Sequence, residues 1–489
     1  MSKHAIVIGA GMGGLASAID LAASGFRVTL LERQSVPGGK MREVMVDGSG
    51  IDSGPTVFTM RWVFDSLLQH AGTSLDSCVE LVEAEDLARH AWLDGSRLDL
   101  YADLDRSVEA IAEFAGSDEA DAYRRFAQDS ASVFETLDES FMRREKPGPV
   151  GLTLSVGLLR LNRLFQTKPF TSLWAELGRV FKDPRLRQLF ARYSTYCGSS
   201  PFQSPATLML IAHAERAGVW MVRGGMQRFA EALLETAEHC GVETRLETSV
   251  DEVLVDRRGV TGVRLQDGET LMSDCVVFNG DVNALTHGML GRGVAKAVPD
   301  RRKEERSLSA VTWSMKATTR GFPLRYHTVF FGADYRAEFD AIFKRQTVCD
   351  EPTLYLCAQD RIGGTAPEQA EKLFVLMNAP PRALSQSEID DFEARAFSLL
   401  GRHGLGVDIA SVERTLPSDF DARFPGSDGA IYGWPTHGAF GTFKRSGSRS
   451  SIKGLYFAGG TVHPGPGIPM ASLSGRIAAQ SIREDLGVS

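Results

Sequence analysis

The sequence predicts an α/β fold in which one domain is assembled from three separate parts of the chain. Three observations predict it: residues 1–32 have the order strand, turn, helix, strand; residues 242–278 are rich in strands; and a strand meets glycines at 455–460. Inserts of roughly 200 residues separate these blocks, as in a discontinuous domain with other segments threaded between its parts. The expected division is a cofactor domain over 1–100, 217–285 and 450–489, a helical lid over 101–216, and a substrate domain over 286–449.

The N-terminal block combines a glycine motif with an acidic residue. An apolar strand over 5–8 is followed by a G-x-G-x-x-G motif and a helix to about Ala23, and a second strand over 26–31 ends in an acid. In such a motif the first glycine permits a tight turn, the second lets the backbone approach a pyrophosphate, and the third allows helix and strand to pack closely. An acid 18 residues after the motif can bind ribose hydroxyls. The block predicts a Rossmann-like dinucleotide site made of Gly9, Gly11, Gly13, Gly14 and Glu32.

The middle block supplies further strands. A helical pattern runs from Met226 to Glu238, and apolar strands follow over 250–255, 260–265 and 275–278. Turns at Arg258-Gly259 and Asp267-Gly268 separate these strands, which indicates short antiparallel connections.

The C-terminal block is the most constrained part of the chain. Between Gly459 and Met470 there are four glycines and three prolines, followed by a helix over 471–482. A backbone of this kind can lie flat against a planar ring, and the helix N-terminus near Met470 offers positive potential to an anion there. His463, within this loop, is either a base or a residue that binds backbone groups.

Composition excludes several classes of function. A formal net charge of −8 and a pI of about 5.8 give no overall positive field, which argues against nucleic-acid binding. The six cysteines are scattered without a CxxC pair and the ten histidines have no ligand spacing, so no disulfide framework or metal site is expected. A reducing compartment fits this cysteine usage best.

No run of about 18 apolar residues is present, so we expect no membrane-spanning helix. Residues 147–174 nevertheless stand apart, because they are rich in Leu, Val and Phe and contain Arg160, Arg163 and Lys168 but no acid. Two interpretations are open: a lid helix that packs on its neighbours, or a helix that lies on a membrane surface.

Several motifs resemble those of one class of flavoproteins. Pro37-Gly38-Gly39-Lys40 resembles the extended dinucleotide motif of the amine-oxidase and phytoene-desaturase class, and residues 51–56 resemble the segment that this class places beside the flavin ring. The resemblance implies an amine-oxidase-like fold with FAD as cofactor. It also implies that Lys40 reaches the phosphates, that Pro55 and Thr56 lie beside the flavin, that the Val250 backbone meets adenine, and that Gly459, Gly460 and Met470 line the ring.

Residues 463–469 resemble the C-terminal signature of bacterial carotenoid desaturases. The departures at Gly459-Gly460-Thr461-Val462, with Met470 after the final Ile-Pro, resemble the branch that acts on 1-hydroxy- or 1-methoxy-neurosporene. The resemblance implies 3,4-desaturation of such a carotenoid, with an allylic hydride passing to the flavin and a proton leaving the adjacent carbon.

A C40 polyene has almost no polar groups, so the shape of its binding site must position it. Tyr193, Tyr196, Trp220 and Met221 are candidates for lining its site, although each also fits an ordinary core. The lipophilic substrate implies a peripheral protein on the cytoplasmic side of the inner or intracytoplasmic membrane, with oxygen or a quinone as electron acceptor. No catalytic base is identified.

Three alternatives remain. A phytoene desaturase would share the family motifs, and an amine oxidase would share the dinucleotide scaffold. A flavin-free carrier of prenyl lipids would share only the fold, and the intact glycine motif with Glu32 and Lys40 argues against it.

Overall fold

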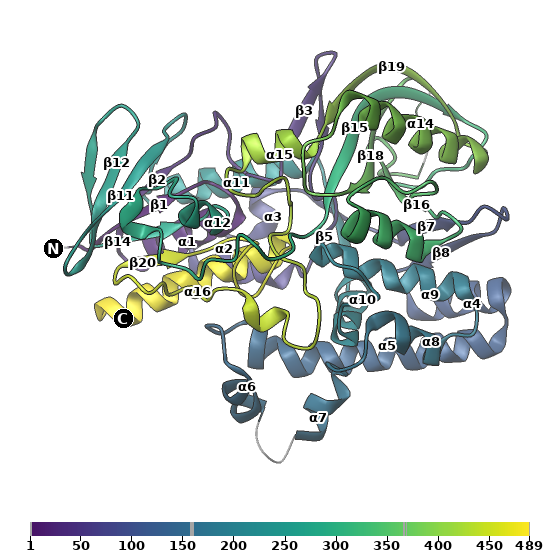
Figure 1. Cartoon of the computed structure of the whole chain (residues 1–489), viewed down its shortest axis with the longest axis horizontal. Helices are drawn as coiled ribbons and strands as arrows, with labels where there is room; N and C mark the ends of the chain where they lie inside the picture. Colours follow the sequence, from purple (N-terminus) through teal and green to yellow (C-terminus); the bar gives the residue numbers. More distant parts are fainter. Residues whose placement is uncertain (1, 157–160, 365–366, 368, 489) are drawn as a thin grey trace.

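The computed structural model describes residues 2–156, 161–364, 367 and 369–488. A parallel five-stranded sheet joins the N-terminal, middle and C-terminal blocks, seen in Figure 1 as purple, teal and yellow strands side by side. Its order is β10-β2-β1-β14-β20, with β1 (His4–Ile8), β2 (Arg27–Leu31), β10 (Glu243–Arg245), β14 (Cys275–Phe278) and β20 (Leu455–Phe457). The predicted α/β fold is confirmed.

Both faces of this sheet are buried. In β1, Ala5 and Val7 pack against the helical layer, whereas Ile6 packs against the opposite layer, because successive side chains of a strand point to opposite faces. The helical layer contains α1 (Met12–Ala23), α2 (Trp62–His70), α3 (Leu75–Cys78), α11 (Met226–His239) and α16 (Ile468–Leu486). The opposite layer contains β11 (Val250–Asp256), β12 (Gly259–Leu265), β13 (Thr270–Met272), α12 (Asn283–Thr286) and η5 (Arg292–Val294).

The C-terminal helix is longer than the predicted 471–482. It begins at Ile468 and includes Pro469 in its first turn, where a proline is tolerated because the missing N–H would be unpaired anyway. It ends at Leu486, before Gly487, which adopts the left-handed conformation common after helices.

A second, seven-stranded sheet forms the upper right of Figure 1. Its order is β19-β15-β18-β17-β16-β7-β8, with β7 (Asp86–Ala91), β8 (Arg97–Tyr101), β15 (Ser309–Arg320), β16 (His327–Phe330), β17 (Leu354–Ala358), β18 (Glu371–Ala379) and β19 (Gly406–Thr415). The helix α14 (Gln386–Arg402) covers one face. The domain boundary at residue 100 stays a prediction, and the pairing of β7 with β16 favours grouping 86–101 with the substrate segments.

Residues 101–216 are mainly helical. Their helices are α4 (Leu104–Ala115), α5 (Ser117–Leu137), the π-helix η1 (Asp138–Met142), α6 (Pro149–Val156), α7 (Leu161–Gln166), α8 (Leu173–Val180), α9 (Pro184–Ala191), the 3₁₀ helices η3 (Arg192–Cys197) and η4 (Ala206–Met209), and α10 (Leu210–Arg216). Arg160 of the basic, apolar stretch lies outside the described residues. Among the described helices, none combines the length and the apolar character needed to cross a bilayer.

Short elements connect these layers. They are the hairpin β3 (Glu43–Val46) and β4 (Ser49–Asp52), the small sheet of β5 (Phe58–Thr59), β9 (Val219–Val222) and β6 (Leu81–Glu83), and the helices α13 (Tyr335–Phe339), η6 (Asp340–Arg345), α15 (Pro417–Arg423) and η7 (Thr442–Lys444). The strand β9 is important for the site, because it brings the end of α10 next to the segment that follows Thr56.

Candidate functional site

One cavity of about 1340 Å³ connects the edge of the parallel sheet with the lid. At one end it meets the carboxyl ends of β1 and β2, where parallel sheets bind their ligands. Its wall includes nearly all of the predicted cofactor residues: Gly9, Gly11, Gly13, Glu32, Lys40, Pro55, Thr56, Val250, Gly459, Gly460 and Met470. Residues that are far apart in sequence therefore share one wall, and their contact with a cofactor stays a prediction.

The glycine motif leaves bare backbone on this wall. Gly9 has φ = +99°, a conformation that favours glycine, and a Cβ on Gly13 would lie 2.5 Å from the backbone nitrogen of Gly459. A Cβ on Gly14 would lie 1.9 Å from the carbonyl oxygen of Gly9, inside the strand-to-helix packing. Gly14 thus has the packing position expected of the third glycine, and Gly13 is packed closely against Gly459. Gly9, Gly11 and Gly13 also line the cavity, where they present backbone without side chains.

Asn279, at the end of β14, holds this loop in place. Its side-chain amide donates to the carbonyl oxygen of Gly9 over 3.1 Å, and its backbone N–H donates to Ile8. A Cβ on Gly11 would lie 2.9 Å from the same amide nitrogen. No local motif marks Asn279 as a residue of the site, because its partner Gly9 is 270 residues away along the chain.

Glu32 is fixed at the end of β2. One carboxylate oxygen accepts from the backbone N–H of Ala10 over 2.7 Å, and the other accepts from Gln34 over 2.8 Å. Burial raises the pKa of Glu32, although both backbone donors oppose this. The carboxylate therefore has a defined direction on the cavity wall, as ribose binding requires.

Lys40 makes a contact that the sequence did not predict. Its ammonium group donates to the carbonyl oxygen of Ile431 over 2.6 Å and lies 5.4 Å from the centre of the Phe424 ring. Burial lowers the pKa of Lys40 to about 8, although Asp281 acts in the opposite direction. Lys40 lines the cavity, and its binding to phosphates stays a prediction.

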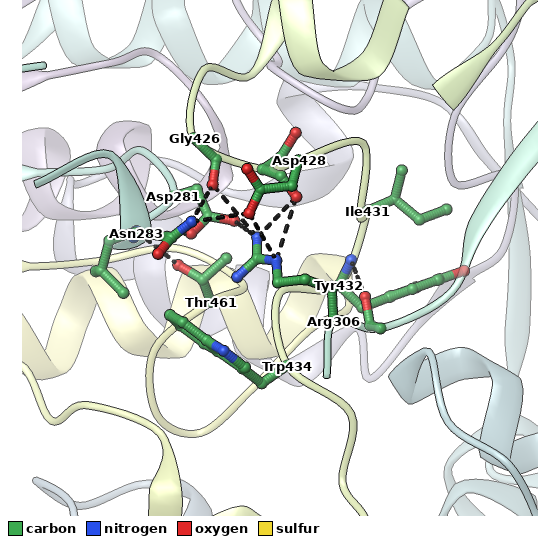
Figure 2. A network of polar contacts seen from close by, with 12 residues as sticks. Asp281, Asn283, Arg306, Gly426, Asp428, Ile431, Tyr432, Trp434 and Thr461 are labelled. Atoms are coloured by element: carbon green, nitrogen blue, oxygen red, sulfur yellow. Dashed lines mark hydrogen bonds and ion pairs between the residues drawn. The ribbon is translucent and has the colours of Figure 1, made fainter. Parts of the chain in front are cut away.

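The loop that contains Ile431 is tied to the parallel sheet by a buried ion pair, shown in Figure 2. Arg306 donates to the Asp281 carboxylate over 2.7 Å and also donates to the carbonyl oxygens of Gly426 and Ser427. Asp281 lines the cavity directly after β14. This network fixes the carbonyl group that Lys40 binds.

The segment 51–56 is anchored from both sides. The Asp52 carboxylate accepts from the backbone N–H groups of Met226 and Gln227, over 2.7 and 3.3 Å, and thereby caps α11. Burial raises the pKa of Asp52 to about 6. Thr56, on the cavity wall, lies 2.6 Å from the hydroxyl of Tyr355, which in turn lies 2.6 Å from Nδ1 of His327. This segment presents Pro55 and Thr56 to the cavity in one fixed arrangement.

The contacts of His463 favour one of its two interpretations, that of a residue that binds backbone groups. Its Nε2 lies 2.9 Å from the carbonyl oxygen of Phe141 and 3.0 Å from that of Arg144. Burial lowers its pKa to about 4, so the ring is neutral near pH 7 and donates from Nε2. His463 is not among the described residues that line the cavity.

The far half of the cavity is lined by apolar residues of the lid, including Phe134, Leu164, Leu208 and Ile211. Of the four side chains proposed from the sequence as lining, only Tyr196 is on the described wall; Tyr193 and Met221 are core residues, and Trp220 is partly buried against the core around the parallel sheet. Phe165, Phe170 and Phe440 line the cavity but are 73%, 74% and 56% exposed, so they mark its mouth.

These features are typical of one class of protein: an oxidoreductase that holds a dinucleotide cofactor beside an apolar substrate cavity. Comparison with known proteins then identifies the family. The family described as flavin containing amine oxidoreductase matches residues 12–483, and the chain belongs to this family. It is an FAD-dependent oxidoreductase, and the bare glycine backbone described above fits this cofactor.

Two of its most similar relatives are hydroxyneurosporene desaturases. The protein from Rubrivivax gelatinosus is 46% identical over 99% of this chain and 94% of the relative, and that from Cereibacter sphaeroides is 45% identical over 98% of this chain and 97% of the relative. A phytoene desaturase from Fusarium fujikuroi is 32% identical over 100% of this chain and 90% of the relative. These identities confirm the resemblance to carotenoid desaturases.

Among solved structures, a triple mutant of putrescine oxidase has a TM-score of 0.62 at 13% identity, covering 100% of this chain and 99% of that chain. At this identity the likeness shows the fold alone.

Proposed function

We propose that this chain is a carotenoid desaturase that introduces a double bond between C3 and C4 of a 1-hydroxy- or 1-methoxy-neurosporene, on the route to spheroidene-type pigments. The observation that carries the proposal is one continuous cavity, which begins at the wall formed by the predicted cofactor residues and ends at an apolar mouth. A long polyene can enter such a cavity end first and bring a bond near its terminus to the cofactor. The hydroxyneurosporene desaturases among the relatives support this substrate class over phytoene.

The reaction removes two hydrogens from adjacent carbons. Bound FAD would supply the two-electron acceptor for a hydride from one of these carbons, and the other carbon would lose a proton. The residues of this chain contribute position and exclusion of water. The loop from Gly459 to Met470 and the segment with Pro55 and Thr56 form two sides of the cofactor wall, and apolar lid residues enclose the remainder.

We further propose that the mouth docks on a bilayer, at the cytoplasmic face of the inner or intracytoplasmic membrane. The exposed apolar side chains of this region, hereafter the mouth patch, are Val150, Leu154, Phe165, Phe170 and Phe440. Three of them also line the cavity, so a carotenoid could pass from lipid to cavity without crossing water. Oxygen or a membrane quinone would then reoxidise the cofactor.

Anaerobic addition of 1-hydroxyneurosporene in liposomes to the FAD-loaded protein tests the substrate. We expect the flavin absorbance to bleach and a product with one more conjugated double bond to form, while phytoene leaves the spectrum unchanged. Conversion of phytoene alone would favour the phytoene desaturase alternative. Bleaching by a polyamine alone would favour an amine oxidase, and failure to bind FAD would favour the carrier.

A further inference from the structure

A buried ionic network lies in the wall of the otherwise apolar part of the cavity. Arg192 donates to the hydroxyl of Tyr196 over 2.9 Å, and this hydroxyl donates to the Glu215 carboxylate over 2.8 Å. All three residues line the cavity, and Arg192 is only 7% exposed. A buried guanidinium remains charged and costs free energy to desolvate, so its presence beside an apolar polyene requires an explanation.

The network lies at the inner end of the cavity, away from the mouth. At the outer end of the helical stretch η4–α10, the Thr207 hydroxyl donates to the carbonyl oxygen of Thr167, close to the mouth patch. Glu215 is eight residues further along this stretch, which places it on the order of 12 Å deeper.

The strand after α10 indicates which part of the cavity lies near Glu215. In β9, Val219 pairs with Thr59 of β5, so the end of α10 lies beside the segment that begins with Pro55 and Thr56. Tyr355 bonds to both Thr56 and His327. Arg192 lies close enough to this group that its charge adds to burial in lowering the pKa of His327. The network therefore faces the part of the cavity where the flavin ring is predicted.

The chemistry of the proposed substrate calls for a polar group at this point. In a 1-hydroxy- or 1-methoxy-carotenoid, the oxygen is on C1, and only C2 separates C1 from the C3–C4 bond. A site that holds this bond beside the cofactor must hold the oxygen there too. Both a hydroxyl and a methoxy oxygen accept hydrogen bonds, whereas arginine has five N–H donors. Within the described part of the chain, the one side-chain hydrogen bond of Arg192 is that from Nη1 to Tyr196, so Nη2 of its guanidinium remains as a donor for a ligand.

We propose that Arg192 donates a hydrogen bond to the C1 oxygen of the carotenoid and thereby selects oxygenated substrates. Tyr196 and Glu215 are positioning residues: they orient the guanidinium and balance its charge. The inference rests on the proposed function, and it adds the residues that recognise the end group.

Tyr193 provides a matched control. Its hydroxyl donates to the other oxygen of Glu215 over 2.9 Å, but Tyr193 is not on the described wall. The experiment measures kcat/KM for 1-hydroxyneurosporene and for neurosporene, which lacks the oxygen, with FAD-loaded protein in liposomes. The variants are Arg192→Met with Glu215→Gln, which removes both charges together, Tyr196→Phe, and Tyr193→Phe.

We expect the double variant to lose about ten- to a hundredfold of the preference for the hydroxylated carotenoid, with kcat/KM for neurosporene changed much less. Tyr196→Phe should lose part of the preference, and Tyr193→Phe should keep it. The inference would be overturned if the double variant kept the wild-type preference for the hydroxylated carotenoid. It would also be overturned if Tyr193→Phe lost as much of this preference as the double variant. Either result would leave the proposed function intact. If the double variant does not bind FAD, Tyr196→Phe decides by the same ratio. A wild-type protein that converts no 1-oxygenated carotenoid would instead overturn the proposed function, and the inference with it.

Discussion

Gly475 of α16 packs directly on the carbonyl oxygen of Gly13 in α1, and a Cβ at position 475 would lie 2.1 Å from this oxygen. The contact joins the last helix of the chain to the glycine motif at its beginning. Because α1 carries the motif that faces the cavity, the position of α16 determines where the motif lies.

The first prediction concerns this contact. Gly475→Ala should separate α1 from α16, destabilise the protein by about 1–3 kcal/mol and weaken FAD binding. Thermal unfolding and the flavin content after purification measure the two effects. Gly401→Ala is the control, since Gly401 lies in α14 with open space around its Cβ position. Equal behaviour of the two variants would contradict the prediction.

A second prediction concerns pH. Burial raises the pKa of Asp52 from 3.8 to about 6, so the folded state binds a proton more tightly than the unfolded state does. The stability that this proton contributes is fully present below about pH 4 and is lost as the pH rises through about 6. We therefore expect the free energy of unfolding of the wild-type protein to fall by about 2–3 kcal/mol, relative to that of Asp52→Asn, between about pH 4 and pH 7.

Chemical denaturation at each pH gives the unfolding free energies of the wild-type protein and of Asp52→Asn. Their difference reports on Asp52 alone, because all other titrating groups are common to both proteins. A pH-independent difference between the two proteins would show that the carboxyl group keeps its ordinary pKa.

The third prediction separates the two interpretations of His463. Since Nε2 donates to backbone carbonyl groups, His463→Gln keeps a donor at nearly the same place and should retain kcat within a few-fold. His463→Ala leaves the carbonyl oxygen of Phe141 without this donor and should cost about 1–3 kcal/mol of stability. Steady-state rates with a carotenoid substrate and thermal unfolding test this. A large loss of kcat in a stable, FAD-loaded His463→Gln variant would favour the interpretation of His463 as a catalytic base.

The fourth prediction concerns the mouth patch. Phe165→Ser combined with Phe170→Ser removes two aromatic side chains from the proposed membrane contact, each worth roughly 1.5–3 kcal/mol when fully buried. We expect binding to liposomes in a flotation assay to fall by at least about tenfold. Met272→Ser is the control, because Met272 on β13 is 61% exposed and is not on the described cavity wall. Similar losses in both variants would argue against a specific docking face.

Contiguous features of the site could be predicted from the sequence. The helix after the glycine motif ends at Ala23 as expected, because small residues and Gly25 mark it locally. All of the predicted cofactor residues except Gly14 line one cavity, because each belongs to a motif with its own local geometry.

What could not be predicted depends on partners that are distant in sequence. Lys40 binds the carbonyl oxygen of Ile431, and nothing near Lys40 in the sequence indicates this. Arg192 and Glu215 lie on separate helical segments, and in the sequence each resembles an ordinary surface residue. Only the structure shows that the Tyr196 hydroxyl bridges them. A charged pair inside an apolar cavity has no local pattern, because the low-dielectric surroundings come from elements elsewhere in the chain.

The strand order of the parallel sheet has a consequence for biosynthesis. Gly13 and Gly459 face each other across the cofactor wall but stand at opposite ends of the chain. During translation at about 5–20 residues per second, the N-terminal motif would wait on the order of tens of seconds for its C-terminal counterpart. The exposed edge of β14 would stay unpaired until β20 emerges. If the C-terminal block forms part of the FAD site, we expect a nascent chain stalled before residue 455 to carry no flavin, which absorbance of purified ribosome-bound chains would measure.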